Sequence, residues 1–290
     1  MNYPDIFFTP EYQELFKDTE FGGEPCHFAC AGIDYRFYKR AIEGTPYFDI
    51  VSPYGYSGPI ALMADAQWII FLDAFHDYCL EDNIVAEFAR LHPFIGTNIW
   101  LSPYYERDIY YIGLVDSREQ IWHNFDKGCK SAVKKAQREF GFAQFLGGIS
   151  DEFPCQYQAQ SLYHFDYEFF DKARRLLAGY IVTFTAGESL ALFLIYGDYC
   201  HYFLSAGHGA ANLILWEAIQ WAKAQGCKLF NLGGGLRAGD SLESFKRSFT
   251  PFHKPFFTYR KIHNQKMYNE LCEAKGIDPK SKGYFPAYRN

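Results

Sequence analysis

Three consecutive glycines and, eleven positions later, a lysine lie within one short stretch of the chain, NLGGGLRAGDSLESFKRSF, residues 231–249. A glycine run before a helix can hold a phosphate on its backbone amides. The run NLGGG, however, lacks the spacing of GxxxxGK[ST], and G-x-G-x-x-G needs a glycine where the chain has Ala238. The spacing therefore favours a structural turn that positions the following helix, and direct contact between the glycine amides and a ligand stays the alternative.

A second loop, SAGHGAAN at 205–212, joins an expected strand directly to an expected long helix. The first amides of a helix have no partner within the helix and carry partial positive charge, so they attract anions. Ser205, Gly207 and Gly209 are therefore candidate binding residues for an anionic group. The alternative is an ordinary helix start.

A basic stripe marks an expected helix over 117–140. Ser117 and Gln120 form a capping box, and Gly141 ends the helix. At about 100° per residue, the basic residues fall on the side opposite the apolar stripe. They are Lys127, Lys130, Lys134 and Arg138. This face is a candidate phosphate-binding surface, with a solvated helix face as the alternative.

The loop SPYGYSGP at 52–59 contains prolines and glycines that exclude a regular helix or strand. Tyr54 and Tyr56 are candidates to line a substrate cleft, and packing within a rigid loop is the alternative. The histidines show no HExxH or other metal-ligand spacing, and neither GxSxG nor a protease cysteine signature occurs. We therefore expect no metal ion and no covalent nucleophile.

The elements that position these residues follow a clear order. In the first half, apolar residues at helical spacing predict a helix over 65–80, and strands follow at 83–88 and 108–115. The second half predicts, in order, a helix at 166–178, strands at 180–185, 189–196 and 199–205, a helix at 211–225, a strand at 228–232, a short helix from Asp240, a strand at 255–261 and a helix near 264–274.

The order of these expected elements resembles that of a GNAT acyltransferase: three antiparallel strands, a glycine-bearing loop into a helix, then a strand, a helix and a strand. More specifically, the sequence resembles the Fem family of peptidoglycan-bridge aminoacyltransferases, which consist of two GNAT-like halves. The matching pieces run through most of the chain in the family's order: DIVSPYGYSGPI, NIVAEFARLHP, KGCKSAVKKAQREFG, the loop and helix at 205–225, and NLGGG with DSLESFKRSF.

The resemblance implies an α/β (α+β) class with two tandem GNAT-like acyl-CoA N-acyltransferase folds, whose mixed sheets are flanked by helices. We expect an N-terminal half at 1–141 and a C-terminal half at 142–262. A C-terminal helix and tail at 263–290 is a candidate to pack back on the first half.

The resemblance also assigns roles to individual residues. Phe245 and Lys246 match the family's Phe-Lys pair, whose lysine assists the acyl carbonyl or the nucleotide leaving group. A fixed ammonium is able to stabilise such developing negative charge. The alternative is an exposed helix lysine paired with Glu243. The family's basic helix, which helps bind substrate phosphates, matches Lys127, Lys130, Lys134 and Lys135.

Two departures from the family pattern affect the site. Some members carry an acid where this chain has Ala89. Residues two apart in a strand share a face, so Glu87 points the same way about 7 Å earlier and is a candidate general base. A salt bridge with Arg90 or a surface position is the alternative. The usual Arg or Gln before the glycines of the GNAT pyrophosphate loop is also missing from SAGHGAAN.

Composition limits the class of protein. A chain of 290 residues with 49% hydrophobic residues can bury the cores of two domains, and a 20% aromatic fraction suits bulky cores or a cleft for sugars or extended peptides. The eight cysteines contain no CxxC pair, which favours free thiols in the cytoplasm. A net charge of -6 argues against DNA binding. Neither a signal peptide nor a transmembrane segment is expected.

These patterns predict an N-acyltransferase in which a primary amine attacks an activated acyl group. The resemblance implies an aminoacyl-tRNA donor, with the tRNA 3′ end as a candidate partner, and a peptidoglycan precursor as acceptor. An acyl-CoA donor and another small-molecule amine form the first alternative, and we expect no tightly bound cofactor. The second alternative is a non-catalytic binder of glycans or nucleotide-linked cell-wall precursors.

Overall fold

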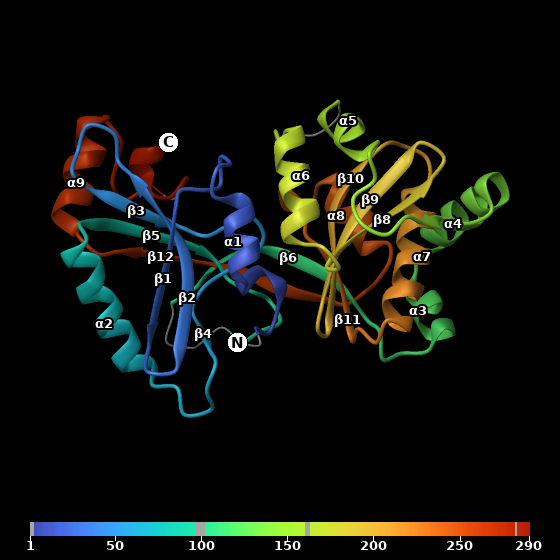
Figure 1. Ribbon diagram of the computed structural model, residues 1–290, viewed down its shortest axis with the longest axis horizontal. Helices are drawn as coiled ribbons and strands as arrows, with labels where there is room; N and C mark the ends of the chain where they lie inside the picture. Colours follow the sequence, from blue (N-terminus) through green and yellow to red (C-terminus); the bar gives the residue numbers. More distant parts are fainter. Residues whose placement is uncertain (1–2, 97–101, 160–162, 282) are drawn as a thin grey trace. The chain divides into compact units, whose positions relative to one another are not determined.

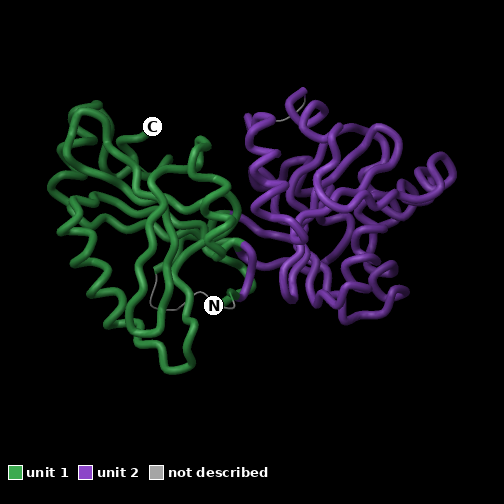
Figure 2. The backbone as a smooth tube through the Cα atoms, in the orientation of Figure 1, with its two compact units in different colours: residues 1–3, 7–106, 256–290 green, residues 4–6, 107–255 purple. Residues whose placement is uncertain are grey.

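The computed structural model describes residues 3–96, 102–159, 163–281 and 283–290, and its backbone divides into two compact units (Figure 2). Unit 1 comprises residues 1–3, 7–106 and 256–290, and unit 2 comprises residues 4–6 and 107–255. Strands β6 (Tyr104–Gly113) and β12 (His253–Ile262) have residues in both units. The chain therefore enters unit 2 along β6 and returns to unit 1 along β12.

Unit 1 contains a mixed sheet. Its strands pair in the order β1 (Glu24–Cys30), β2 (Ile33–Ala41), β3 (Phe48–Val51), β5 (Ile84–Arg90) and β12, and the short β4 (Ile60–Ala61) pairs with β2. Strands β3 and β5 are parallel, and the other neighbours are antiparallel. The register places Glu87 of β5 opposite Lys261 of β12.

Helices and 3-10 turns complete unit 1 (Figure 1). They are η1 (Ile6–Phe8), which begins in unit 2, α1 (Pro10–Phe16), α2 (Trp68–Glu81), α9 (Gln265–Ala274) and η2 (Ala287–Arg289). Helix α2 confirms the helix predicted over 65–80, because Phe71, Phe75 and Cys79 are buried against Tyr35 of β2. Helix α9 and η2 form a second cluster with Val85 of β5.

Unit 2 contains a second mixed sheet. Its strands pair in the order β6, β11 (Leu229–Gly233), β10 (Tyr199–Ala206), β9 (Ser189–Tyr196), β8 (Ile181–Ala186) and β7 (Gln144–Phe145). Strands β10 and β11 are parallel and are connected by α7, and the other neighbours are antiparallel. The helices are α3 (Arg118–Asn124), α4 (Lys127–Phe140), α5 (Phe153–Gln158), α6 (Tyr167–Leu176), α7 (Ala211–Ala224) and α8 (Ser241–Arg247).

The helix predicted over 117–140 is two helices in the structure, α3 and α4. Phe125 is extended, with ψ 142°, and the Asp126 side chain accepts a hydrogen bond from the backbone N–H of Cys129. An aspartate in this position caps a new helix. The single-helix prediction is therefore wrong at Phe125 and Asp126, because helical periodicity continues through a local break.

Helix α4 belongs to unit 2, whereas the sequence placed it in a first half ending at 141. Its buried residues Cys129 and Val133 lie in one hydrophobic cluster with Leu215 and Ile219 of α7. The chain after residue 255, including α9, belongs to unit 1. The observed units therefore divide the chain at different positions from the expected halves.

Candidate functional site

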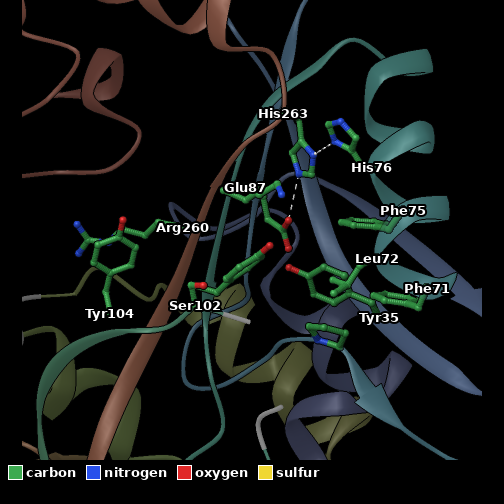
Figure 3. Close-up of a pocket in the computed structure, with 13 residues that line it drawn as sticks. Tyr35, Phe71, Leu72, Phe75, His76, Glu87, Ser102, Tyr104, Arg260 and His263 are labelled. Atoms are coloured by element: carbon green, nitrogen blue, oxygen red, sulfur yellow. Dashed lines mark hydrogen bonds and ion pairs between the residues drawn. The ribbon is translucent and has the colours of Figure 1, made fainter. Parts of the chain in front are cut away.

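A cavity of about 190 Å³ lies in unit 1 beside β5 and α2 (Figure 3). Its wall is largely aromatic, with Tyr35, Phe71, Phe75 and Tyr259 contributed by three different elements. Glu87 supplies a carboxylate to this lining. The cavity thus combines an aromatic wall with one acidic group, which is buried, among its described lining residues.

Glu87 is bound to one histidine, which is bound in turn to a second. Its relative exposure is 2%, and its Oε2 lies 3.1 Å from Nε2 of His263. Nδ1 of His263 lies in turn 3.0 Å from Nδ1 of His76 on α2 (Figure 3). The backbone N–H of His263 donates to the carbonyl oxygen of Val85, which ties the histidine to β5. The surface position considered for Glu87 is therefore wrong.

The tyrosine hydroxyls and the cysteine thiol around Glu87 keep their protons at neutral pH. Burial raises the pKa of Tyr35, Tyr259 and Cys79 well above the ordinary values, and the negative charge of Glu87 raises each further. Burial lowers the pKa of His76, and His263 and Lys261 lower it further. A carboxylate next to neutral hydroxyls is able to accept a proton from a substrate.

Ala89, where some Fem proteins carry an acid, is fully buried in the hydrophobic cluster of α2 and β2. The residues that line the cavity include Glu87 and not Ala89. Arg260 also lines the cavity and forms an ion pair with Glu106. Its guanidinium lies 5.3 Å from the ring centre of Tyr104, so a paired cation lies at the cavity beside an aromatic face.

The predicted lysine of unit 2 is buried. Lys246 on α8 has a relative exposure of 8%, and its Nζ donates a 2.6 Å hydrogen bond to the carbonyl oxygen of Gly234. Burial lowers the pKa of Lys246 to about 7; Asp240 acts to raise it and Arg107 lowers it. Phe245, its neighbour in the expected pair, packs on Phe249 with ring centres 5.3 Å apart.

The alternative pairing of Lys246 with Glu243 on an exposed face is wrong. Glu243 accepts hydrogen bonds from the backbone N–H of Gly239, at 2.6 Å, and from the hydroxyl of Tyr110, at 3.0 Å. Asp240 accepts from the backbone N–H of Glu243 and is the predicted N-cap of α8. In the described hydrogen bonds, the acidic side chains at this helix start accept from backbone N–H groups and from the Tyr110 hydroxyl and not from the lysine.

The glycine run is a tight turn fixed by charged side chains. Arg107 donates to the carbonyl oxygens of Gly235, at 2.5 Å, and Leu236, at 2.9 Å. Asp240 Oδ2 accepts from the backbone N–H groups of Leu236 and Arg237. A Cβ on Gly234 would lie 2.6 Å from the carbonyl oxygen of Asp108, so this position needs glycine. These contacts support the structural-turn interpretation of NLGGG.

The basic stripe on α4 lies on the outside of unit 2. Lys127, Lys134 and Arg138 are exposed, while Lys130 is half-buried and donates to the carbonyl oxygen of His123. Lys134 lines a shallow hollow of about 350 Å³ beside Trp122 and Trp216. Lys135, on the same helix, is also exposed. Three of the four predicted cations are thus accessible to an anionic ligand.

The loop before α7 is held by Ser189. Its hydroxyl donates to the carbonyl oxygen of His208, at 2.7 Å, and accepts from the backbone N–H of Ala210, at 3.1 Å. Gly207 has φ +81°, and a side chain there would overlap the carbonyl oxygen of Glu188. Gly209 has φ +97° and faces open space, and Ser205 at the end of β10 is exposed. The loop is therefore fixed by hydrogen bonds and is accessible to a ligand at Gly209.

The two tyrosines of SPYGYSGP pack against aromatic residues of unit 1. The Tyr54 ring stacks on Phe16, with ring centres 5.6 Å apart, and Tyr56 contacts Phe7 edge-on at 5.0 Å. Both are half-buried, and neither is among the residues that line the cavity of Figure 3. The contacts observed within unit 1 are those of the packing alternative.

The residues that the sequence analysis missed are distant from their partners in the chain. His263 is separated from Glu87 by 176 positions and from His76 by 187. Arg107 is 128 positions from Gly235. Local spacing holds no signal for such pairs. His263 lies two positions after the predicted strand at 255–261, and this was the available indication.

No protein-family model and no curated protein matches the sequence. Among solved structures, the crystal structure of FemX matches with a TM-score of 0.64 at 10% sequence identity, over 90% of this chain and 97% of that chain. The chain has the fold of FemX. This confirms the predicted fold class of tandem GNAT-like units with mixed sheets flanked by helices.

Two further structures share this FemX-like fold. L-PGS from Bacillus licheniformis matches with a TM-score of 0.54 at 12% identity, over 91% of this chain and 95% of that chain. The C-terminal domain (DUF2156) of a putative lysylphosphatidylglycerol synthetase from Agrobacterium fabrum matches with a TM-score of 0.54 at 11% identity, over 90% and 92%. In the part of the chain that is described, no helix is long and apolar enough to cross a membrane.

Proposed function

We propose that the protein is an N-acyltransferase that transfers an aminoacyl group from aminoacyl-tRNA to the primary amine of a peptidoglycan precursor. The observation that carries the proposal is the buried carboxylate of Glu87, which lines an aromatic cavity and is bound to His263 at 3.1 Å. The FemX-like fold supports the choice of reaction class.

The reaction needs a base because an ammonium ion is not a nucleophile. The amine nitrogen attacks the acyl carbonyl carbon, the bond from that carbon to the leaving oxygen breaks, and an amide forms. Glu87 takes the proton that the nitrogen loses as the amide forms and passes it, through water, to the leaving oxygen. His263 occupies Oε2 of Glu87. Oε1 is therefore the atom assigned to the substrate proton.

Lys246 of unit 2 is assigned to the acyl donor. In its charged form it is a fixed cation at the glycine turn, suited to negative charge on the acyl carbonyl or the leaving group. The exposed stripe Lys127, Lys134 and Arg138 is assigned to phosphates of a nucleotide-linked precursor or of the tRNA 3′ end. This assignment requires no tightly bound cofactor, and we expect the protein to act in the cytoplasm.

A transfer assay tests the proposal. The purified protein is incubated with charged tRNA or with acyl-CoA, and with a UDP-linked muropeptide or a simple diamine, and the products are identified by mass spectrometry. We expect tRNA-dependent acylation of the muropeptide amine. Transfer from acyl-CoA and not from charged tRNA would show that acyl-CoA is the donor. Binding of the muropeptide without transfer from either donor would favour a non-catalytic binder.

The variant Glu87→Gln tests the assigned base. Glutamine keeps the shape of the side chain but cannot take a proton, so we expect kcat to fall by about 10²-fold or more. Glu273→Gln, on the exposed side of α9, is the matched control and should retain wild-type rates. Equal rates for both variants would remove Glu87 from the reaction.

A further inference from the structure

His263, which contacts Glu87, and His76 face each other through their Nδ1 atoms. Nδ1 of His263 and Nδ1 of His76 are 3.0 Å apart, the ring centres are 5.3 Å apart, and the ring planes differ by 25°, so the two rings meet edge to edge. A hydrogen bond of this kind holds one proton, so one ring donates through Nδ1 and the other accepts. The tautomer of each histidine therefore depends on the other.

The carboxylate fixes the proton at one end of this chain, and the charge of His263 then decides the direction of the bond to His76. An ionised Glu87 accepts hydrogen bonds and cannot donate, so Nε2 of His263 carries the proton directed at Oε2. A neutral His263 with a proton on Nε2 has a free lone pair on Nδ1, and His76 must then donate its Nδ1–H. The lowered pKa of His76 agrees with a neutral ring in this position.

The surroundings of His263 fix its ring. Its relative exposure is 9%, and the edge of Phe75 lies against it with ring centres 6.1 Å apart. Its backbone N–H is bound to the carbonyl oxygen of Val85. The enclosed ring directs Nε2 of His263 at Glu87. His76, a half-buried residue of α2, contacts the other ring nitrogen, Nδ1, and so controls whether that nitrogen carries a proton.

From this geometry we infer that His263 and His76 are positioning residues that act through Glu87. His76 donates to His263 and thereby holds it in the Nε2–H tautomer, and His263 then donates to Oε2 and orients Oε1 for the substrate proton. The inference rests on the proposed function for its catalytic meaning. The hydrogen-bond chain itself is a property of unit 1 and can be measured without substrate.

The variants His76→Leu and His76→Asn separate a positioning role from a packing role. Leucine fills the space without a donor, whereas asparagine places an amide nitrogen near the position of Nδ1. Imidazole ¹⁵N chemical shifts of His263, assigned with His263→Gln, report the tautomer directly. We expect the Nε2–H tautomer in the wild type and in His76→Asn, and a mixture of both tautomers in His76→Leu.

Kinetics complete the test. We expect kcat of His76→Leu to fall about tenfold with an unchanged KM, and His76→Asn to recover most of the loss. A proton on Nδ1 of wild-type His263, or an unchanged tautomer and kcat in His76→Leu, would overturn the inference. If the wild type transfers no acyl group, the proposed function fails, while the ¹⁵N measurement still decides the direction of the chain.

Discussion

Nζ of Lys246 lies 2.6 Å from the carbonyl oxygen of Gly234, inside the turn that Arg107 and Asp240 hold in place. Burial lowers the pKa of this lysine to about 7. Charged and neutral forms are therefore both present near neutral pH. A cation in a dry environment acts strongly on nearby negative charge, which is the role assigned to Lys246 at the acyl donor.

Replacing Lys246 with methionine should lower kcat by about 100-fold, because the apolar side chain keeps the volume and removes the charge. The control is Arg247→Met, one position further along α8 and exposed. Steady-state transfer rates and circular dichroism of both variants test this prediction. A folded Lys246→Met protein with wild-type rates would exclude Lys246 from the reaction.

The activity that depends on this cation should fall as the pH rises through about 7, because a lysine loses its charge above its pKa. Lys246→Arg provides the comparison, since a guanidinium stays charged throughout this range. We expect the alkaline loss in kcat of the wild type to disappear in the arginine variant, whatever rate that variant retains. If kcat falls at alkaline pH in the same way in both proteins, the loss is caused by the titration of another group.

The glycine turn should be sensitive to a single methyl group. A Cβ on Gly235 would overlap the Asp240 carboxylate and lie 2.9 Å from the carbonyl oxygen of Arg237, so Gly235→Ala must displace the side chain that caps α8. We expect a loss of about 1–3 kcal/mol in the free energy of unfolding, measured by denaturant titration.

Gly148→Ala is the matched control for this turn. Gly148 has nothing within 4 Å of the added Cβ, and its φ is outside the left-handed region. Its substitution should change the free energy of unfolding by about 0.5 kcal/mol or less. Equal effects of the two substitutions would show that the contacts of Gly235 do not stabilise the turn.

The sequence could predict elements whose signal is local. Helix α2 follows from apolar residues at helical spacing, and α8 begins at Asp240 as its capping pattern indicates. The hairpin of β1 and β2 was missed, because Tyr35, Phe37 and Tyr38 are all buried and the alternation typical of a half-exposed strand is absent. The break at Phe125 was missed because the apolar stripe continues across it.

The candidate site was predictable only in part, for a related reason. Glu87 could be proposed because the family pattern points to its strand, and the structure shows it buried in a cavity. His76 and His263 reach it from α2 and from the end of β12, and no spacing in the sequence connects those segments. The burial that lowers the pKa of Lys246 is likewise a tertiary effect on a residue that looks exposed in its short helix.

The basic stripe of α4 should affect substrate binding and not the chemical step. Replacing Lys134 and Arg138 with glutamate reverses two exposed charges, so KM for a phosphate-bearing substrate should rise at least tenfold with little change in kcat. The wild-type KM should also rise with salt, because mobile ions screen exposed charges.

The control for charge reversal is Lys266→Glu in α9 of unit 1 together with Lys275→Glu at the C-cap of that helix, and both lysines are exposed. This variant carries the same change in net charge and should keep the wild-type KM. A KM that is independent of salt and equal in the two variants would identify the α4 stripe as a solvated helix face.

The loop before α7 distinguishes the two donors. An acyl-CoA enzyme must bind a pyrophosphate at the amides near Gly209, whereas transfer from aminoacyl-tRNA does not require that loop. Because SAGHGAAN lacks the Arg or Gln usual in this loop, we expect calorimetry to detect weak or no binding of CoA and acetyl-CoA, and Gly209→Val to leave tRNA-dependent transfer unchanged. Gly197→Val is the control, since Gly197 also has positive φ and open space around its Cβ. Micromolar CoA affinity that is lost in Gly209→Val and kept in Gly197→Val, without transfer from charged tRNA, would establish acyl-CoA as the donor.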